Sequence, residues 1–376
     1  SPESKTCFFI DTFGNELPIG KHAKLKIADK FSEGLICINF KKQDWQPEAW
    51  GCLNAKGDTL IKGAFLESFI FNCGVAKVVV SAMPTRISNE DEEPEYHCQY
   101  INTQGVLINE KVFENNTSSL MANNWAVAKW GAKWFIISKY GLLKELSVDY
   151  ESVDPFSDGM AKCKRMNGYT AYIDTTRWSV LELPNENYFG DFHNGFAAYS
   201  TTKDKYGFIN KKGQPVTTCI YEAVSFFNED LVAIKMYKKW GYADAKGKLI
   251  ISPNYEATGG FKEGLAWVMV NGKYGFIDKN DLVVVPIKYT QVLNFENGMA
   301  AVCDDKNLWG FINKKGDWVI KPQFIGAENF DKWGYARVLY ADKHSYKKGT
   351  LEHYEKALLN KRGNVIWYSG EKLILK

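Results

Sequence analysis

The sequence predicts an all-β protein built from short antiparallel strands. Three observations support this: a strand–turn–strand pattern recurs at nearly constant spacing, each copy carries the same turn residues, and segments with helical periodicity are few. Aromatic residues make up 15% and apolar residues 45% of the 376 residues. A chain of this length can form one body when each repeat packs on its neighbours.

Residues 261–292 contain one complete copy of the pattern. An apolar run at 265–270 predicts a first strand, and 274–277 predicts a second. Asn271 and Gly272 lie between them, and both tolerate positive φ, so they predict a tight hairpin. A third strand at 282–285 is expected to end at Pro286, which has no N–H to donate to a neighbouring strand. One unit should therefore hold three antiparallel strands in roughly 34 residues.

The turn between the second and third strands has its own signature. Asp or Asn occupies the first position and Gly the fourth at residues 210–213, 244–247 and 313–316. This pattern is typical of a type I turn followed by a left-handed residue. Such turns close hairpins that contain a bulge.

A glycine lies inside the second strand and follows an aromatic residue in five copies. Glycine within a strand marks a bulge or a close approach of another group. We expect a neighbouring aromatic side chain to cover the gap, and the aromatic residue before each glycine to belong to the core. The five pairs are Trp50-Gly51, Tyr206-Gly207, Trp240-Gly241, Tyr274-Gly275 and Trp309-Gly310.

A phenylalanine begins most copies and is followed three residues later by Gly or Asp. Successive copies are 34 to 36 residues apart from residue 156 onward, and two more begin near residues 31 and 71. A further degenerate copy begins near residue 120, and residues 7–19 match only the last two strands. The chain therefore contains nine copies and a leading half. The regularly spaced phenylalanines are Phe156, Phe192, Phe227, Phe261, Phe295 and Phe330.

The motif Lys-Tyr/Trp-Gly-Phe-Ile-Asp/Asn-Lys-x-Gly resembles the WG-repeat family, also called KWG repeats. The resemblance is close from residue 192 to 338 and loose before residue 190, where Cys98 and Thr170 replace the aromatic residue and Phe135 replaces the glycine. We therefore divide the chain into degenerate repeats at 1–190 and regular repeats at 191–376, forming one continuous array. The resemblance implies a β-rich array, common in bacteria, with no established enzymatic activity and no catalytic residues to transfer.

The arrangement of the units has two alternatives. A closed propeller usually has four to eight blades of four strands. Nine and a half three-stranded units fit one ring poorly, so an open, curved solenoid is expected. The rival is one or two propeller-like rings, in which residues 372–375 supply the strand missing from the N-terminal half unit. Contact between Ile10 and Leu373 would decide for closure.

Composition limits the classes of partner and compartment. The net charge is +3 with both signs interleaved, which argues against nucleic-acid binding, and no apolar run is long enough for a transmembrane segment. Eight cysteines occur without a C-x-x-C pair, so we expect buried free thiols rather than a zinc site. Free thiols favour a reducing compartment, whereas a chain without an initiator methionine favours export to the periplasm or cell surface of a bacterium. Both remain open, with export preferred.

Candidate binding residues lie where the sequence departs from its own repeat. Residues 41–49 form an insertion that contains Trp45. Residues 83–96 form a second insertion with five carboxylates, and residues 341–355 form a third that should be a long hairpin. The acidic segment lacks the alternating ligands and central glycine of a calcium loop, so we expect no metal. The candidates are Trp45, Glu90, Asp91, Glu92, Glu93 and Glu95.

No catalytic or cofactor motif is present. The sequence has no H-E-x-x-H helix, no G-x-S-x-G elbow, no phosphate-binding glycine loop and no dinucleotide fingerprint. We therefore expect a non-catalytic scaffold that binds a protein partner, with the degenerate N-terminal half carrying the recognition surface. The alternatives are a glycan-binding or cell-wall-binding module that uses the repeat aromatics, and an unrecognised hydrolase.

Overall fold

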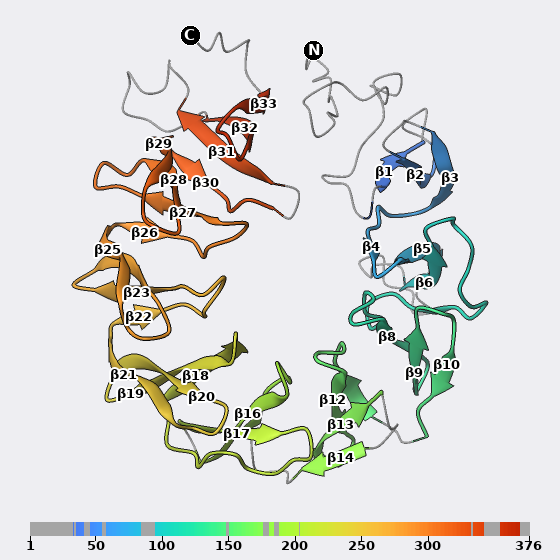
Figure 1. The fold of residues 1–376 in the computed structure, drawn as a ribbon. Coiled ribbons are helices and arrows are strands. Elements are labelled where there is room, and N and C mark those ends of the chain that lie inside the picture. Colours follow the sequence, from blue (N-terminus) through green and yellow to red (C-terminus); the bar gives the residue numbers. More distant parts are fainter. Residues whose placement is uncertain are drawn as a thin grey trace, which may run out of the picture. The chain divides into compact units, whose positions relative to one another are not determined.

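A computed structural model describes residue 33 and residues 35–40, 46–54, 58–83, 95–147, 150–175, 180–183, 188–202, 204–331, 334–341 and 354–368. These residues form strands β1 to β33, arranged in nine antiparallel sheets, and they contain no helix. The all-β prediction is confirmed (Figure 1). Within the described part of the chain, no helix could cross a membrane.

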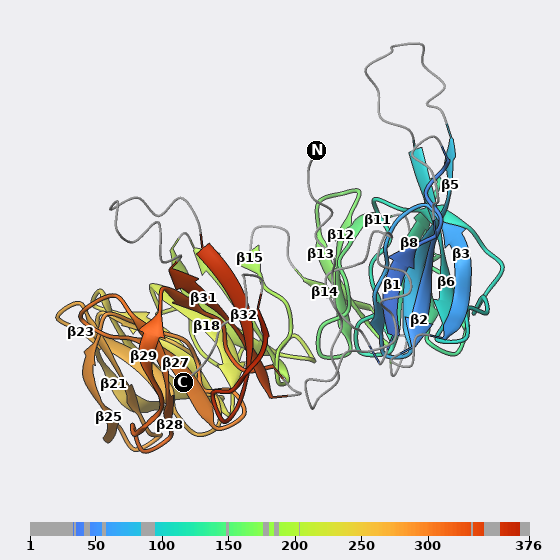
Figure 2. The same cartoon turned by 90° about the horizontal axis from the view of Figure 1, so that it is seen from above.

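The chain divides into two compact units, which we call unit 1 and unit 2; the described residues up to 183 belong to unit 1 and those from 188 onward to unit 2. In unit 1, the β5–β6 hairpin extends past the neighbouring sheets (Figure 2). The strands of unit 1 are β1 (Leu35–Asn39), β2 (Trp50–Asn54), β3 (Thr59–Phe65), β4 (Phe71–Asn72), β5 (Val75–Met83), β6 (Glu95–Asn102), β7 (Phe113–Glu114), β8 (Trp125–Trp130), β9 (Lys133–Ser138), β10 (Leu143–Glu145), β11 (Tyr150–Val153), β12 (Met160–Arg165), β13 (Thr170–Asp174) and β14 (Val180–Leu183).

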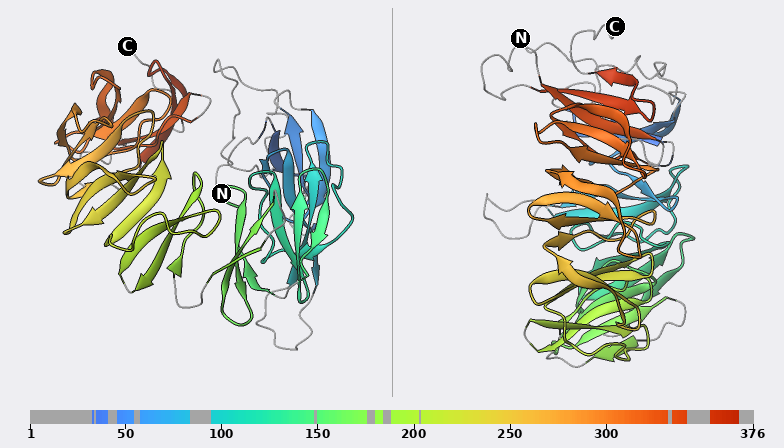
Figure 3. Two further views of the ribbon diagram at one scale, coloured as in Figure 1. Left: turned by 60° about the horizontal axis from the view of Figure 1, so that its bottom comes forward. Right: turned by 60° about the vertical axis from the view of Figure 1, so that its left-hand side comes forward.

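Unit 2 contains five sheets that follow one another in chain order (Figure 3). Its strands are β15 (Tyr188–Phe189), β16 (Phe196–Thr202), β17 (Lys205–Asn210), β18 (Ala223–Asn228), β19 (Leu231–Met236), β20 (Lys239–Asp244), β21 (Leu249–Tyr255), β22 (Ala257–Thr258), β23 (Ala266–Val270), β24 (Lys273–Ile277), β25 (Val283–Tyr289), β26 (Gln291–Val292), β27 (Met299–Cys303), β28 (Trp309–Asn313), β29 (Trp318–Phe324), β30 (Gly326–Ala327), β31 (Tyr335–Ala341), β32 (Tyr354–Asn360) and β33 (Val365–Tyr368).

Most sheets contain one strand more than the three expected. Six of the nine are four-stranded, with strand orders such as β22-β23-β24-β25. The additional strand is often only two residues long: Ala257 and Thr258 pair with Met269 and Val268 just before the leading phenylalanine. Two residues without a β-branched or aromatic run give no strand signal in the sequence, so the prediction missed them.

The turn chemistry is as predicted. Asn271 and Gly272 have φ of 50° and 70°, and Gly316 has φ of 86°. In the turn that joins β28 to β29, the Asn313 side-chain oxygen accepts hydrogen bonds from the backbone N–H groups of Lys315 (2.9 Å) and Asp317 (3.0 Å). The first residue of this turn therefore fixes the turn itself, while the glycine supplies the left-handed backbone.

Backbone atoms of the neighbouring segment cover the glycine of the second strand, and an aromatic side chain also covers it only at Gly207 (Tyr199) and Gly310 (Trp318), so the expectation was wrong for Gly51, Gly241 and Gly275. A Cβ on Gly275 would lie 2.6 Å from the carbonyl oxygen of Val285 and 2.7 Å from Cα of Ile287. Tyr274 pairs with Tyr289 but Phe276 pairs with Val285, so three residues of β25 bulge opposite one glycine. The bulge contains a proline, which cannot take part as a donor in the strand pairing. Only glycine leaves room for it.

Buried aromatic pairs join consecutive repeats. The leading phenylalanine of one repeat packs on the aromatic residue that follows the strand glycine of the repeat before, and both residues are buried. Ring centroids lie 5.0 Å apart for Phe208–Phe227, 4.8 Å for Tyr242–Phe261, 4.7 Å for Phe276–Phe295 and 4.8 Å for Phe311–Phe330. The core is thus divided among the junctions between sheets, and we call this series of pairs the aromatic seam.

Two predictions from the sequence lie at the limits of the described residues. Ile10 and Leu373 fall outside them, as does the N-terminal half unit, so the open array remains a prediction. β31 and β32 pair continuously from Tyr335–Asn360 to Ala341–Tyr354. Residues 342–353 of the third insertion lie outside the described residues, so the long hairpin there stays a prediction.

We expect Gly275→Val to destabilise unit 2 by about 3 kcal/mol, the upper end of the usual range for overpacking, because backbone atoms lie where the Cβ would be. Gly316→Asn is the matched control, and should cost about 1 kcal/mol or less, since Asn adopts a left-handed backbone readily. A Cβ there would lie 3.5 Å from Val285, an ordinary contact. Denaturant unfolding of both variants measures the difference. A larger loss for Gly316→Asn would contradict these roles.

The aromatic seam predicts energetic coupling between repeats. In a double-mutant cycle, Phe276→Leu and Phe295→Leu should be non-additive by about 0.5–1.5 kcal/mol, the range for an edge-to-face ring pair. Phe208→Leu combined with Phe295→Leu is the control, and should be additive because these residues lie in different junctions. Equal non-additivity in both cycles would mean that the coupling does not come from ring contact.

Candidate interaction surfaces

The candidate residues chosen from the sequence are only partly within the described structure. Trp45, Glu90, Asp91, Glu92 and Glu93 lie outside the described residues. Glu95 is exposed at the start of β6, where it pairs across the hairpin with Met83. The predicted grouping of these residues therefore remains a prediction.

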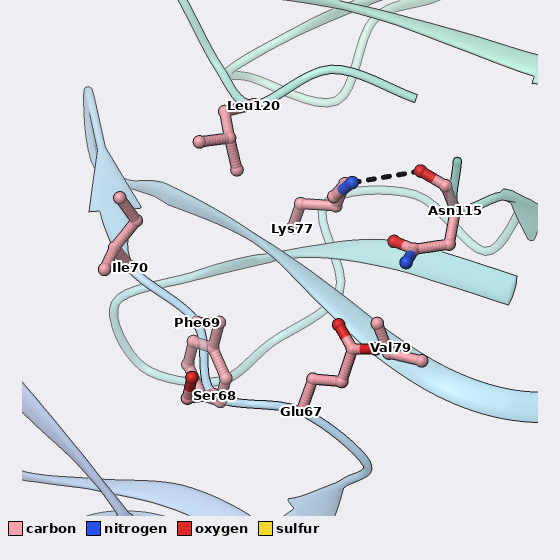
Figure 4. Close-up of a pocket in the computed structure, with 8 residues that line it drawn as sticks. All are labelled: Glu67, Ser68, Phe69, Ile70, Lys77, Val79, Asn115 and Leu120. Atoms are coloured by element: carbon pink, nitrogen blue, oxygen red, sulfur yellow. Dashed lines mark hydrogen bonds between the residues drawn. The ribbon is translucent and has the colours of Figure 1, made fainter. Parts of the chain in front are cut away.

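Unit 1 contains a small pocket of about 250 Å³ beside β5. Apolar side chains form much of its wall, and Glu67, Lys77 and Asn115 supply polar groups (Figure 4). The Lys77 Nζ donates to the backbone carbonyl oxygens of Asn115 (3.0 Å) and Ser118 (2.9 Å). Two of its three N–H groups are thus used to hold the segment between β7 and β8.

Lys77 occupies a strand position that is alanine in three regular repeats and Trp267 in a fourth. It pairs with Tyr100 across β5 and β6, as Ala233 pairs with Tyr242 and Ala301 with Phe311. The charged residue at that position is visible in the sequence, but the pattern that predicted the strands did not single it out. Because the ammonium group already binds two carbonyl oxygens, we interpret Lys77 as a residue that holds the segment between β7 and β8 in place, and not as a catalytic group.

Exposed apolar side chains recur at one position of three consecutive repeats in unit 2. Leu249, Val283 and Trp318 each begin the third long strand of their sheet, and their exposed fractions are 44%, 47% and 36%. They are equivalent by register, since each pairs with the last residue before the turn: Ala243, Ile277 and Ile312. We call Leu249, Ile250, Leu282, Val283, Trp318 and Val319 the apolar edge stripe; all six are exposed.

The apolar edge stripe lies on sheet edges. Strands β21, β25 and β29 each come last in the strand order of their sheets. Each carries a proline at or just after its middle: Pro253, Pro286 and Pro322. Proline on an edge strand prevents pairing with another chain. Binding here would therefore depend on the side chains and not on the addition of a strand.

Contacts between repeats join the start of one edge strand, or the turn before it, to the end of the preceding edge strand. The Trp318 ring meets the Tyr289 ring edge-on with centroids 5.9 Å apart, and Tyr289 ends the edge strand of the preceding repeat. In the same way, the hydroxyl of Tyr255, at the end of β21, contacts the Asp281 carboxylate just before β25. The edge strands follow one another along one side of unit 2 (Figure 1).

Ion pairs partly neutralise the basic turns beside the stripe. The Lys279 ammonium lies 3.5 Å from Glu229, and the Lys314 ammonium lies 3.1 Å from Glu263. Glu263 also accepts a hydrogen bond from the backbone N–H of Gly298 in the next repeat (2.9 Å). Burial acts to raise the pKa of Glu263, but Lys314 and the Gly298 N–H outweigh it, and the pKa is lowered. Apolar area therefore distinguishes the stripe more than charge does.

Sequence reasoning assigned these residues to strands but did not find that they are exposed. Strand alternation would bury one of any two adjacent residues. Here Tyr242 pairs with Ile251 and Ala243 with Leu249, so Ile250 is an extra bulge residue and both Leu249 and Ile250 reach solvent. The recurrence of two apolar residues after each turn was the available signal.

The described residues contain no group of three or more His, Cys, Asp or Glu side chains that could hold a metal ion.

The observed architecture is that of an all-β repeat protein. Four consecutive segments match the family model for the WG containing repeat: residues 206–240, 240–274, 274–307 and 309–343. The resemblance to the WG-repeat family is thus confirmed for residues 206–343, which lie in unit 2.

A search of the curated proteins found no match. Among solved structures, a eukaryotic initiation factor is similar over 91% of this chain and 87% of its own, with 10% identity and a TM-score of 0.45. BamB from Moraxella catarrhalis covers 74% of this chain and 90% of its own, with 10% identity and a TM-score of 0.34. YCF48 bound to D1 peptide covers 59% and 88%, with 10% identity and a TM-score of 0.31. We draw no functional conclusion from these scores.

The lowered pKa of Glu263 predicts a pH-dependent contribution to stability. Because the carboxylate is favoured in the folded state, its contribution is present above the pKa of an unfolded glutamate and is lost as pH falls through the lower folded value. Glu263→Gln should lower the free energy of unfolding by about 0.5–1 kcal/mol at pH 7, given partial solvent screening. The difference should shrink toward pH 3. Urea unfolding at both pH values tests this, and a difference that grows at low pH would contradict it.

Proposed function

We propose that the protein is a non-catalytic scaffold that binds a protein partner through the apolar edge stripe of unit 2. The observation that supports this is the recurrence of exposed apolar side chains at one repeat position, on strands whose prolines prevent aggregation through the edge. Contiguous exposed apolar area on a soluble protein is typical of protein-binding surfaces. The aromatic ring of Trp318 would be the natural centre of such a contact.

The distribution of aromatic residues favours this proposal over glycan binding. A glycan-binding repeat would present an exposed aromatic ring at the same position of each unit. The leading phenylalanines and the aromatics after the strand glycines are buried, and those before the glycines are half-buried. The most exposed aromatics occupy unrelated positions: Tyr237 lies in the β19–β20 hairpin and Tyr140 in the turn after β9.

The degenerate N-terminal repeats offer a second location for the same function. Regular repeats can present only similar contacts, whereas discrimination among partners needs distinct ones. We therefore propose that the segments with Trp45 and Glu90–Glu95 form a second recognition surface, in unit 1, that adds specificity. The two locations make separate predictions, which can be tested in one set of variants.

The experiment uses the full chain as bait to identify a partner in the native cell, followed by affinity measurement with the purified partner. The variant Leu249→Gln/Val283→Thr/Trp318→Gln should weaken binding at least about tenfold, or about 1.4 kcal/mol. Leu249 and Val283 should contribute little to the melting temperature because they are exposed, whereas Trp318 gives up its ring contact with Tyr289, so the variant should melt slightly lower but remain folded. Sedimentation with cell-wall polysaccharide, measured in parallel, should show no binding.

Matched controls separate this surface from exposed apolar area in general. Phe226→Gln/Tyr237→Gln removes two more exposed aromatics of unit 2 outside the stripe and should leave affinity unchanged. Deletion of residues 41–45 or 84–94 should weaken binding if unit 1 contributes specificity. Full affinity in the stripe variant would reject the stripe as the binding surface. Wild-type binding to cell-wall polysaccharide that is lost in a variant whose aromatic seam is intact would favour the glycan alternative.

A further inference from the structure

Two cysteines face each other across the first sheet of unit 1. Cys37 in β1 pairs directly with Cys52 in β2, and their sulfur atoms lie 2.9 Å apart. Both side chains are buried, in a cluster with Phe69 and Phe71. This separation is shorter than an ordinary non-bonded sulfur contact, and directly opposed residues of antiparallel strands have the Cα spacing that disulfides require.

The pair occupies the position that carries the aromatic seam elsewhere. Cys52 follows Gly51, as Phe276 follows Gly275, and Cys37 corresponds by register to Ala233 and Ala301. Three regular repeats thus have an alanine opposite an aromatic ring at this site, and a fourth has Trp267 opposite Phe276. This repeat lacks the ring and has two sulfur atoms there instead, so a covalent bond could replace part of the lost packing.

We propose that Cys37 and Cys52 are a disulfide-forming pair that cross-links β1 to β2. With a low-molecular-weight disulfide such as oxidised glutathione, the Cys37 thiolate attacks one sulfur, a mixed disulfide forms and one thiolate leaves, taking up the proton that Cys37 released. Cys52, on losing its proton, then attacks the Cys37 sulfur and displaces the second thiol. Two protein thiols are oxidised, and one disulfide is reduced to two thiols.

The surroundings support Cys37 as the first nucleophile. A hydrogen bond from the Cys52 thiol lowers the pKa of Cys37 more than burial raises it, and the same interaction raises the pKa of Cys52. Both sulfurs are buried, so a reagent reaches them only when β1, the edge strand of its sheet, opens. Formation should therefore be slow in the folded protein and faster during refolding.

The test is disulfide mapping of the full chain after refolding in oxidised and reduced glutathione. Remaining thiols are alkylated under denaturing conditions, and unreduced peptides are analysed by mass spectrometry. The wild type should yield a linked peptide pair containing Cys37 and Cys52, and its melting temperature should exceed that of the reduced form by several degrees.

Two variants make the result specific. Cys303→Ala removes a buried cysteine of unit 2 and should leave the link and the temperature difference intact. Cys37→Ala introduces the residue found at this position in three regular repeats, so it should fold, leave Cys52 fully alkylated and abolish the temperature difference. Alkylation of both Cys37 and Cys52 in oxidised wild-type protein would overturn the proposal, as would linkage of Cys37 to a different cysteine.

Discussion

The contact between a leading phenylalanine and the aromatic ring of the preceding repeat is the interaction on which the regular repeats depend. A single small sheet cannot bury enough apolar area to be stable alone. The pairs Phe276–Phe295 and Phe311–Phe330 supply that area at the junctions, with the rings edge-on, the geometry that aromatic pairs prefer. The repeat length follows from this contact, because each unit must return a phenylalanine to the same place on its predecessor.

The strand glycine serves the same junction from inside the sheet. It allows three residues of the edge strand to bulge over one residue of the neighbouring strand, as at Gly275. The bulge places a proline on the edge, and so this residue without a side chain helps to protect the edge strand against unwanted pairing. A second register shift, next to the turn, leaves adjacent apolar side chains in solvent.

Local chemistry explains which parts of the fold could be predicted from the sequence. The hairpin at Asn271–Gly272 and the left-handed Gly316 depend on residues adjacent in the chain, so their identities were sufficient. The strand Ala257–Thr258 was missed because two residues carry no periodicity. The prediction of which atoms pack against Gly275 was wrong because they belong to the backbone of another strand, and the path of that backbone cannot be inferred from residue types. The apolar edge stripe was missed for the same reason, since a register shift exposes it.

Departures from the repeat can be understood by asking what replaces the aromatic seam. At the position equivalent to Phe276, one sheet of unit 1 has Cys52, which pairs with Cys37, and another has Ile136, which pairs with Val127. Loss of a ring removes much of the buried area at a junction, and packing must then come from aliphatic contact or from a covalent bond. Regular repeats keep their stability inside the junctions and so can vary on their edges. Units that have lost the ring depend on such substitutes, at Cys37–Cys52 and Val127–Ile136, for packing at their junctions.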